Sequence, residues 1–211
     1  MNRTFKEKSV TLIELVIGIA ILGIIILAIS QLDLFSNASI VYAQRRTSLS
    51  NEASMALEHI SKHLTQAIGD WDEPAAENNV IDGDRALFFY IDGNGNHMRD
   101  AGDTPWVYRW TNAPPYLLRF CDSCGDAACD SCIGDNDGAT AWGVVVARHV
   151  LYFGRPSDPD PPGQGAVALQ GNYATIEIQT CQNPAAANCG TTNNPQVDMQ
   201  ASIRMPSYSS N

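Results

Sequence analysis

The sequence predicts an α+β protein in which one long N-terminal helix covers an antiparallel β-sheet head. Two observations support this prediction. Residues 24–68 contain neither Gly nor Pro, a run far longer than an ordinary globular helix, which indicates one continuous helix. The later segments with regular patterning are short runs of aromatic and branched residues bounded by turn formers, as in strands. A helix followed only by strands is expected to lie on the sheet that they form.

Length and charge limit the possible functions. The chain has 211 residues, which is enough for a membrane helix and one modest domain. Its formal net charge is −10. An acidic chain lacks the basic surface that non-specific nucleic-acid binding requires, so we expect no nucleic-acid partner. The acidic balance is compatible with cation binding and with solubility outside the cell.

A strongly apolar segment at residues 9–29 carries one carboxylate, Glu14, near its start. A charged group at helix depth in a bilayer costs roughly 2.5 to 3.5 kcal/mol, so we expect a counter-charge for this acid. An α-amine on Val10 would lie about 6 Å from Glu14 along the helix axis. In a stack of parallel helices offset by about one turn, each acid meets the amine of the next chain, and both charges leave water together.

The stretch Val10-Thr11-Leu12-Ile13-Glu14-Leu15 follows a short basic leader, and this arrangement resembles the N-terminal signature of type IV pilins and type II secretion pseudopilins. The resemblance implies that a prepilin peptidase cuts between Ser9 and Val10 and methylates the new N-terminus at Val10. It also implies that residues 11–15 serve assembly and that Glu14 pairs with the amine of a neighbouring subunit. Ser9 and Val10 stand where the family usually has Gly and Phe, which predicts slower cleavage.

The domain organisation follows from the leader and the apolar segment. The leader, residues 1–9, is basic and should stay in the cytoplasm, which sends the rest of the chain across the inner membrane in a single pass. We expect residues 10–30 to form the transmembrane and polymerisation helix, 31–69 its amphipathic continuation, and 70–211 a β-rich head in the periplasm. The mature subunit would then enter a pilus or pseudopilus at the cell surface. The alternative is a simple membrane anchor with a stray Glu. A secretory signal peptide is disfavoured, because the apolar core is too long for one.

The outer half of the helix is amphipathic. Apolar residues recur there at spacings of three and four, as a helix packing on a head domain requires. They are Leu49, Ala53, Leu57, Ile60, Leu64 and Ala67. Gly69 is the expected stop, which gives a helix of roughly 90 Å. His59 and His63 lie one turn apart and could bind a metal, but no third ligand is suggested and we assign them a structural role.

The head is predicted from its turn and strand patterns. Residues 70–84 are rich in turn formers and predict a loop from helix to sheet. Strands are predicted at 86–91, 106–110, 116–120, 142–153 as one bent strand or two, 173–180 and 197–205. The last two alternate in polarity, so one face should be buried and the other exposed. Residues 155–165 and 182–195 are predicted loops, 206–211 is a polar tail, and the strand order stays open.

An oxygen-rich stretch at 92–103 directly follows the first predicted strand. It fits a twelve-residue calcium loop, in which oxygens at fixed positions surround a hard cation. The predicted Ca²⁺ ligands are the side chains of Asp92, Asn94, Asn96, Asp100 and Asp103 and the carbonyl of Met98. His97 stands where EF-hand loops have Gly, and Asp103 is shorter than the usual Glu. The alternative is a hairpin whose Asp-Gly and Asn-Gly pairs suit left-handed turns.

Six cysteines follow the membrane helix, so on this topology they lie in an oxidising compartment where disulfides form. Four residues between the two Cys-x-x-Cys pairs are too few for a zinc ribbon, and iron–sulfur and haem sites are disfavoured. We favour nested disulfides, one connectivity among fifteen. The predicted pairs are Cys121 with Cys132, Cys124 with Cys129, and Cys181 with Cys189. A Cys-x-x-Cys oxidoreductase is the alternative, although acidic neighbours disfavour a reactive thiolate there.

Residues 45–49 and 56–67 are similar to PilW-type minor pilins and J-type minor pseudopilins. The resemblance implies a minor subunit of a type IV pilus, at or near the tip, that primes assembly by parallel packing of its helix. The implied partners are other pilins or pseudopilins, the prepilin peptidase and the inner-membrane assembly platform. Two alternatives stay open: a minor pseudopilin of a type II secretion system, and a membrane-anchored calcium-binding domain that does not polymerise. No catalytic constellation stands out, so we expect neither an enzyme nor an organic cofactor.

Overall fold

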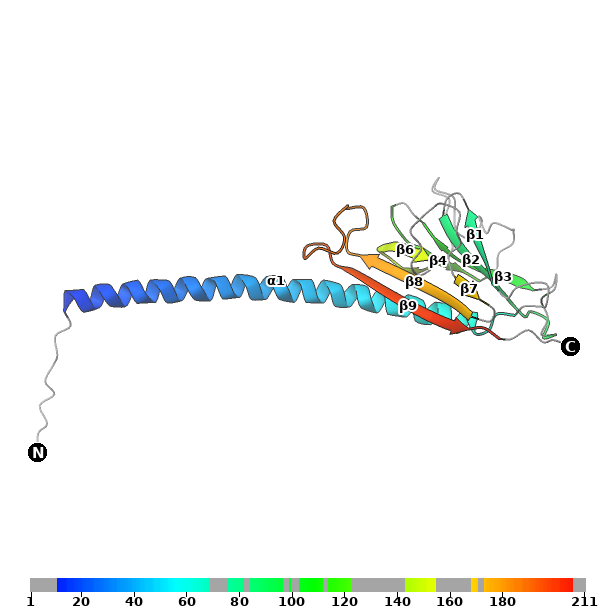
Figure 1. Ribbon diagram of the computed structural model, residues 1–211, viewed down its shortest axis with the longest axis horizontal. Helices are drawn as coiled ribbons and strands as arrows, with labels where there is room; N and C mark the ends of the chain where they lie inside the picture. The colour runs from blue at the N-terminus through cyan, green and yellow to red at the C-terminus, as the bar shows by residue number, and fades with distance from the viewer. Residues whose placement is uncertain are drawn as a thin grey trace, which may run out of the picture. The chain divides into compact units, whose positions relative to one another are not determined.

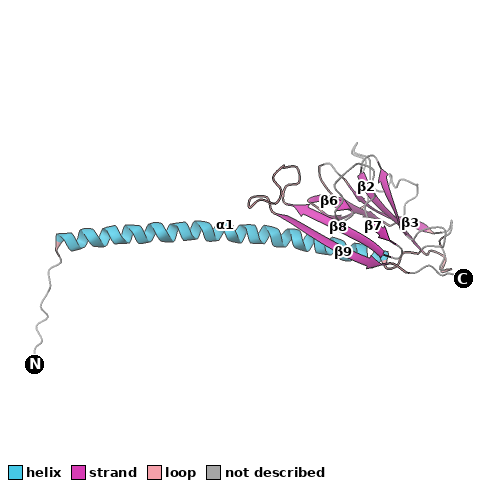
Figure 2. Ribbon diagram, in the orientation of Figure 1, coloured by secondary structure: helices cyan, strands magenta, loops and turns pink. Residues whose placement is uncertain are grey.

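The computed structural model describes one helix and nine strands within residues 11–68, 76–81, 84–96, 99, 103–111, 114–122, 143–154, 168–170 and 173–206. The chain divides into two compact units, residues 1–44 and 45–211. Figure 2 shows the N-terminal helix leading into a head built of strands. The α+β prediction is confirmed. In chain order the elements are α1 (Leu12–Leu64), β1 (Ala76–Ile81), β2 (Asp84–Ile91), β3 (Thr104–Trp110), β4 (Leu118–Cys121), β5 (Val144–Ala147), β6 (Val150–Gly154), β7 (Ala168–Gln170), β8 (Tyr173–Cys181) and β9 (Gln196–Arg204).

The helix ends at Leu64, although the sequence predicts helix to Ile68. The last turn tightens, because the amides of Gln66 and Ala67 each bond the carbonyl three residues earlier, at 2.9 and 3.2 Å. The amide of Ile68 then donates to the carbonyl of Tyr90 on β2 at 2.9 Å. Because the Ile68 amide bonds to β2, it is not available for another helical hydrogen bond, and the chain turns towards the sheet.

The strands form two antiparallel sheets. The five-stranded sheet has the order β1-β2-β3-β4-β5, so neighbours in sequence are neighbours in space. In the second sheet β8 pairs with β9 along its whole length, from Tyr173 to Cys181. The other edge of β8 is shared by β6, opposite residues 177–180, and β7, opposite residues 173–175. Figure 1 shows β9 and β8 running side by side next to the C-terminal part of α1.

The strand predictions are largely confirmed, including two strands within 142–153, and the exceptions are β1 and β7. The segment 142–153 contains two strands, which separate at Arg148 and His149, where His149 takes a positive φ of 56° and the chain passes from one sheet to the other. The loop prediction for 70–84 is wrong for 76–81, which is β1 and pairs in register with β2. The polar run Ala76-Glu-Asn-Asn-Val-Ile lacks strand propensity, so pairing with a neighbouring strand decides its conformation. The short β7 is likewise not predicted.

The core of the head lies where α1 meets both sheets. One face of the helix contributes Leu49, Ala53, Ala56, Leu57, Ile60 and Leu64, which are all buried. Tyr108, Phe89 and Phe153 are the largest fully buried side chains of the sheets. The sheets also bond each other, because Trp110 Nε1 on β3 donates to the carbonyl of Val150 on β6 at 2.9 Å. These contacts make the helix and two sheets one packed unit.

Replacing Ile60 with Ala tests the packing of the helix on the sheets. Ile60 is fully buried, so Ile60→Ala should lower the free energy of unfolding of the head by about 2–5 kcal/mol. Urea unfolding of the full chain in detergent, followed by Trp fluorescence, measures this loss. Met55→Ala is the control, because Met55 is on the same helix and is 68% exposed. Equal effects of the two variants would contradict the packing described here.

Candidate assembly site

A capping box closes the N-terminus of α1. The backbone amide and the hydroxyl of Thr11 both donate to Glu14 Oε2, each at 2.9 Å. The amide of Glu14 in turn contacts Thr11 Oγ1 at 3.4 Å. This reciprocal arrangement satisfies amides that the first helical turn otherwise leaves without partners. The spacing Thr-x-x-Glu could have predicted it, so Glu14 has a local role in its own helix as well as the intersubunit role expected above.

Apolar side chains cover all sides of the first half of α1. Between Leu12 and Phe35 the large apolar residues are about half or more exposed, and Leu12 reaches 82%. By length and composition the helix could cross a membrane, and its most apolar stretch is not buried. Glu14 and Asp33 are the charged residues in the stretch 11–44. A helix that is apolar all round needs an apolar environment, supplied by a bilayer or by other helices.

Comparison with known families identifies this helix. Residues 4–30 match the family model of the prokaryotic N-terminal methylation motif. The chain carries the type IV pilin and pseudopilin signature. The motif implies assembly with other pilins and processing by a prepilin peptidase, and together with the apolar helix it fits a pilin anchored in the inner membrane. Comparisons with curated proteins and with solved structures find no match.

The predicted assembly residues fall in two groups. Thr11 is the N-cap, and Leu12, Ile13, Glu14 and Leu15 form the first turn of α1. Ser9 and Val10 lie outside the described residues, although the matched stretch 4–30 includes them. Cleavage between these two residues and methylation of Val10 therefore stay predictions about this chain.

The predicted calcium loop is described at Asp92, Asn94, Asn96 and Asp103, whereas Met98 and Asp100 lie outside the described residues. Asp92 Oδ1 accepts the amides of Asn94 and Gly95, and Gly95 has a φ of 77°. Asp103 Oδ1 accepts the amide of Gly93 at 3.1 Å. The Asp92 bonds are those of an Asx turn, which the alternative hairpin interpretation expects, whereas the Asp103 bond crosses the loop. Within the described parts of the chain, no three His, Cys, Asp or Glu side chains gather as a metal site, and calcium stays a prediction.

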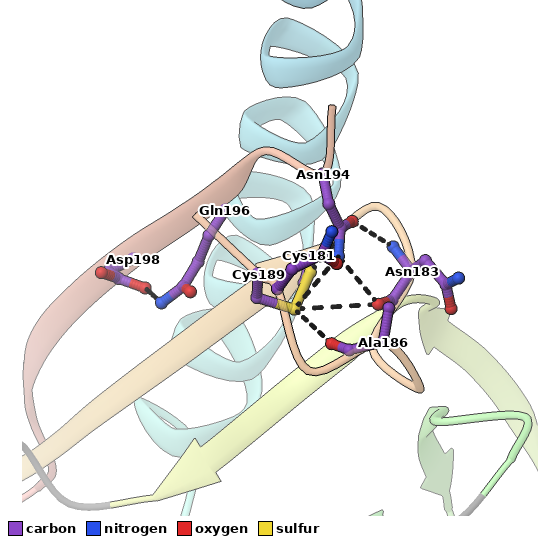
Figure 3. The surroundings of a disulfide bond; sticks show 8 residues. Cys181, Asn183, Ala186, Cys189, Asn194, Gln196 and Asp198 are labelled. Carbon is purple, nitrogen blue, oxygen red and sulfur yellow. Dashed lines mark hydrogen bonds between the residues drawn. A yellow bond between two sulfur atoms is a disulfide. The ribbon is translucent and has the colours of Figure 1, made fainter. Parts of the chain in front are cut away.

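A disulfide joins Cys181 at the end of β8 to Cys189 in the following loop, with the Cα atoms 5.9 Å apart. Asn194, which is 4% exposed, supports this loop (Figure 3). Its Oδ1 accepts the Asn183 amide at 2.8 Å, and its Nδ2 donates to the Asn183 carbonyl and to Asn188 Oδ1, both at 3.1 Å. The segment after Cys189 is thereby held against the loop that the disulfide closes.

The remaining predicted bridges are only partly described. Cys121 is disulfide-bonded, whereas Cys124, Cys129 and Cys132 lie outside the described residues.

The loop that follows β8 also contacts the helix, because Arg45 Nη1 donates to the carbonyl of Asn193 at 3.3 Å. The loop at 182–195 therefore lies beside the first turn of the part of α1 that belongs to the head.

Another polar contact joins α1 to Arg148 and His149, which link β5 to β6, and it was not predicted from the sequence. Glu52 on α1 accepts the backbone amide of Arg148, and its Oε2 lies 3.5 Å from His149 Nδ1. Glu52 and His149 face a shallow groove between the helix and β5. Its lining residues are Ser48, Asn51, Glu52, Met55, Val145, Val146, Ala147, Arg148 and His149. No local signal links these partners, which are 96 residues apart in the Glu52–Arg148 bond.

Replacing Asn194 with Ala tests the support of the disulfide loop. The variant removes the two hydrogen bonds that Asn194 makes with the amide and carbonyl of Asn183, so the head should lose about 1–3 kcal/mol of unfolding free energy. Urea unfolding under oxidising conditions is the measurement. Asn193→Ala is a matched control, because Asn193 is exposed and the described bond uses its backbone carbonyl. An unchanged stability of the Asn194 variant would contradict the assigned role.

Thermal unfolding in EDTA and in Ca²⁺ tests the calcium loop. If the loop binds the ion, Ca²⁺ at a hundredfold excess over its Kd should stabilise the wild-type head by about 2.7 kcal/mol. Asp92→Ala removes the first predicted ligand and should abolish the shift. Asp198→Ala, at an exposed position on β9, should leave it intact. A wild-type melting temperature that does not respond to Ca²⁺ would show that 92–103 is only a turn.

Proposed function

We propose that the chain is a minor subunit of a type IV pilus that assembles through its N-terminal helix. Leader removal between Ser9 and Val10 and N-methylation of Val10 would produce the mature subunit. It then packs α1 in parallel with the helices of other pilins, at or near the tip, and primes filament assembly. The prepilin peptidase and the inner-membrane assembly platform are the proposed partners, and the head is proposed to face the periplasm.

The observation that carries this proposal is the coincidence of the methylation motif with a helical segment whose apolar side chains are exposed on all sides and which holds one acid at its start. A passive anchor needs the apolar surface, and beyond capping its own helix it has no use for a carboxylate at this depth. Glu14 lies one turn from the proposed mature N-terminus, so a neighbouring helix displaced by one turn would bring its amine to this carboxylate. The pair would offset the cost of removing each charge from water.

Two features support a minor over a major subunit, and two others support an exported head. Residues 45–49 and 56–67 are similar to minor pilins, and the unit 45–211 is large for a repeating filament subunit. The basic leader favours the orientation with the N-terminus inside the cell. The disulfide between Cys181 and Cys189 is consistent with an oxidising compartment on the other side of the membrane.

The first alternative is a minor pseudopilin of a type II secretion system, because the same motif and helix serve both machines. Deletion of the gene separates the two functions. Loss of surface pili with intact protein secretion supports the pilus subunit, and the reverse supports the pseudopilin. The second alternative, an anchored calcium-binding domain that never polymerises, predicts that the protein is absent from sheared filaments.

Variants at Glu14 test whether its charge drives assembly. Glu14→Gln keeps a hydrogen-bond acceptor for the capping box but removes the charge, whereas Glu14→Ala removes both. Both variants should abolish recovery in sheared filaments while membrane insertion continues, because an uncharged group cannot pair with the neighbour's amine. Glu58→Ala is the control, because Glu58 is an exposed acid on the same helix within the head. Normal filament incorporation of Glu14→Gln would show that the residue acts only as a cap.

Mass spectrometry of the N-terminus accompanies each variant. Wild-type protein recovered from cells should begin with N-methylated Val10. The same mature end in the Glu14 variants separates an assembly defect from a processing defect. Recovery of the wild type with residues 1–9 still attached, in cells whose peptidase processes other substrates, would contradict the proposal.

A further inference from the structure

Two imidazoles from α1 converge on one phenol hydroxyl of the five-stranded sheet. His59 Nδ1 lies 2.7 Å and His63 Nδ1 lies 2.8 Å from Tyr108 Oη on β3. The same hydroxyl donates to the backbone carbonyl of His59 at 3.1 Å. Tyr108 is fully buried, whereas the two histidines are half-buried. The three residues therefore form a polar contact inside the aromatic layer that joins helix to sheet.

Aromatic rings from three strands enclose this contact. The His63 ring stacks on Phe120 of β4, with centroids 4.6 Å apart, and meets Trp106 of β3 edge to face at 5.2 Å. The His59 ring packs edge to face on Phe120 at 5.1 Å. The two imidazole centroids are 4.5 Å apart. Rings this close, with apolar neighbours, cannot both carry a charge without a large electrostatic cost.

Counting hydrogens assigns the tautomers. A tyrosine hydroxyl has one hydrogen and two lone pairs. Its hydrogen goes to the carbonyl of His59, so both imidazole contacts must use the lone pairs of the oxygen. Each Nδ1 must then carry a hydrogen and donate it to Tyr108. With this assignment every bonding position of the buried hydroxyl is used, and each neutral ring keeps an acceptor at Nε2.

We propose that His59, Tyr108 and His63 form an acid-sensitive latch, in which two neutral Nδ1–H imidazoles hold α1 on the five-stranded sheet and protonation in acid loosens this attachment. Nothing in the proposal depends on which filament the subunit serves. The latch differs from the two-histidine metal site that the spacing alone would allow, because here the Nδ1 atoms bond a hydroxyl. A protein exported from the cytoplasm meets the external pH, so such a latch would make the attachment of the helix responsive to acidification.

The surroundings favour the neutral pair. Burial, His59 and Lys62 lower the pKa of His63 to about 4, and burial with Lys62 lowers the pKa of His59. Burial raises the pKa of Tyr108, so its hydroxyl keeps the hydrogen that it donates. The neighbours from β2, β3 and β4 are the aromatic side chains of Phe89, Trp106 and Phe120. Glu52, paired with Arg148 and His149, is the acid at the β5 end of the same helix–sheet contact.

The direction of the pH effect follows from these shifts. An unfolded histidine has a pKa of about 6.5, above that of the folded pair, so the unfolded chain binds protons first as the pH falls. The stabilisation is complete above about pH 6.5 and is lost between there and about pH 4. For His63 alone, the largest possible effect is about a thirtyfold rise in the unfolding equilibrium constant at pH 5, relative to its value above pH 6.5. Partial exposure of the ring reduces this to several-fold.

Nitrogen NMR tests the tautomers directly. Full-length protein with ¹⁵N-labelled histidine is placed in detergent at pH 7.5, and two-bond ¹⁵N–¹H correlations report which ring nitrogen carries the hydrogen. His59 and His63 should both be Nδ1–H, and Tyr108→Phe should release them towards Nε2–H. The single variants His59→Asn and His63→Asn assign the signals. A hydrogen on Nε2 of either ring in the wild type would overturn the proposal.

Unfolding at several pH values tests the latch. The unfolding equilibrium constant of the wild type should rise several-fold from pH 7 to pH 5. The double variant His59→Asn with His63→Asn retains amide donors but cannot titrate, so its pH dependence should be flatter by that amount. Met55→Ala is the control, because this exposed side chain on the same helix lies outside the latch and cannot titrate, and it should keep the wild-type slope. Equal slopes for the wild type and the double variant would overturn the latch even if the tautomers are as assigned.

Discussion

The packing of one helical face against two sheets is the constraint on which the head depends. Leu49 to Leu64 supply a continuous buried stripe, and each sheet supplies part of the surface that covers it. The second sheet contacts α1 where Ser54 Oγ meets Met199 Sδ at 3.4 Å. The five-stranded sheet contacts it where Tyr108 meets His59 and His63, and Glu52 contacts Arg148 in the link between the two sheets. Without the helix, both sheets would expose apolar faces to water.

The two halves of α1 have different surroundings. Between Leu12 and Phe35 its large side chains are exposed on every side, as suits a bilayer or a bundle of other helices. From Leu49 onwards one stripe is buried and the rest is polar or half-buried. The change in pattern separates the part that the methylation motif assigns to anchoring and assembly from the part that organises the head. Glu14 lies in the first part, where its carboxylate caps its own helix.

Much of this arrangement could be predicted from sequence, because it depends on local patterns. A run of 45 residues without Gly or Pro predicts the helix, and strict alternation of apolar and polar residues predicts β8 and β9. The methylation motif is a continuous stretch that needs no tertiary information. Prediction fails at β1, whose polar sequence becomes a strand through pairing with β2, and at the end of α1, where Ile68 bonds to Tyr90. In both places a neighbouring strand outweighs the local preference.

By itself the sequence determined the class of the fold, the apolar helix and the position of its acid, because periodicity and spacing are properties of consecutive residues. Only the tertiary structure decided that the strands divide into two sheets and that both sheets share one helix. It also decided that His59 meets Tyr108, 49 residues away, so that a pair of histidines with metal-like spacing bonds a hydroxyl. Such contacts depend on which strands pair, and that choice is made by long-range packing that no local pattern records.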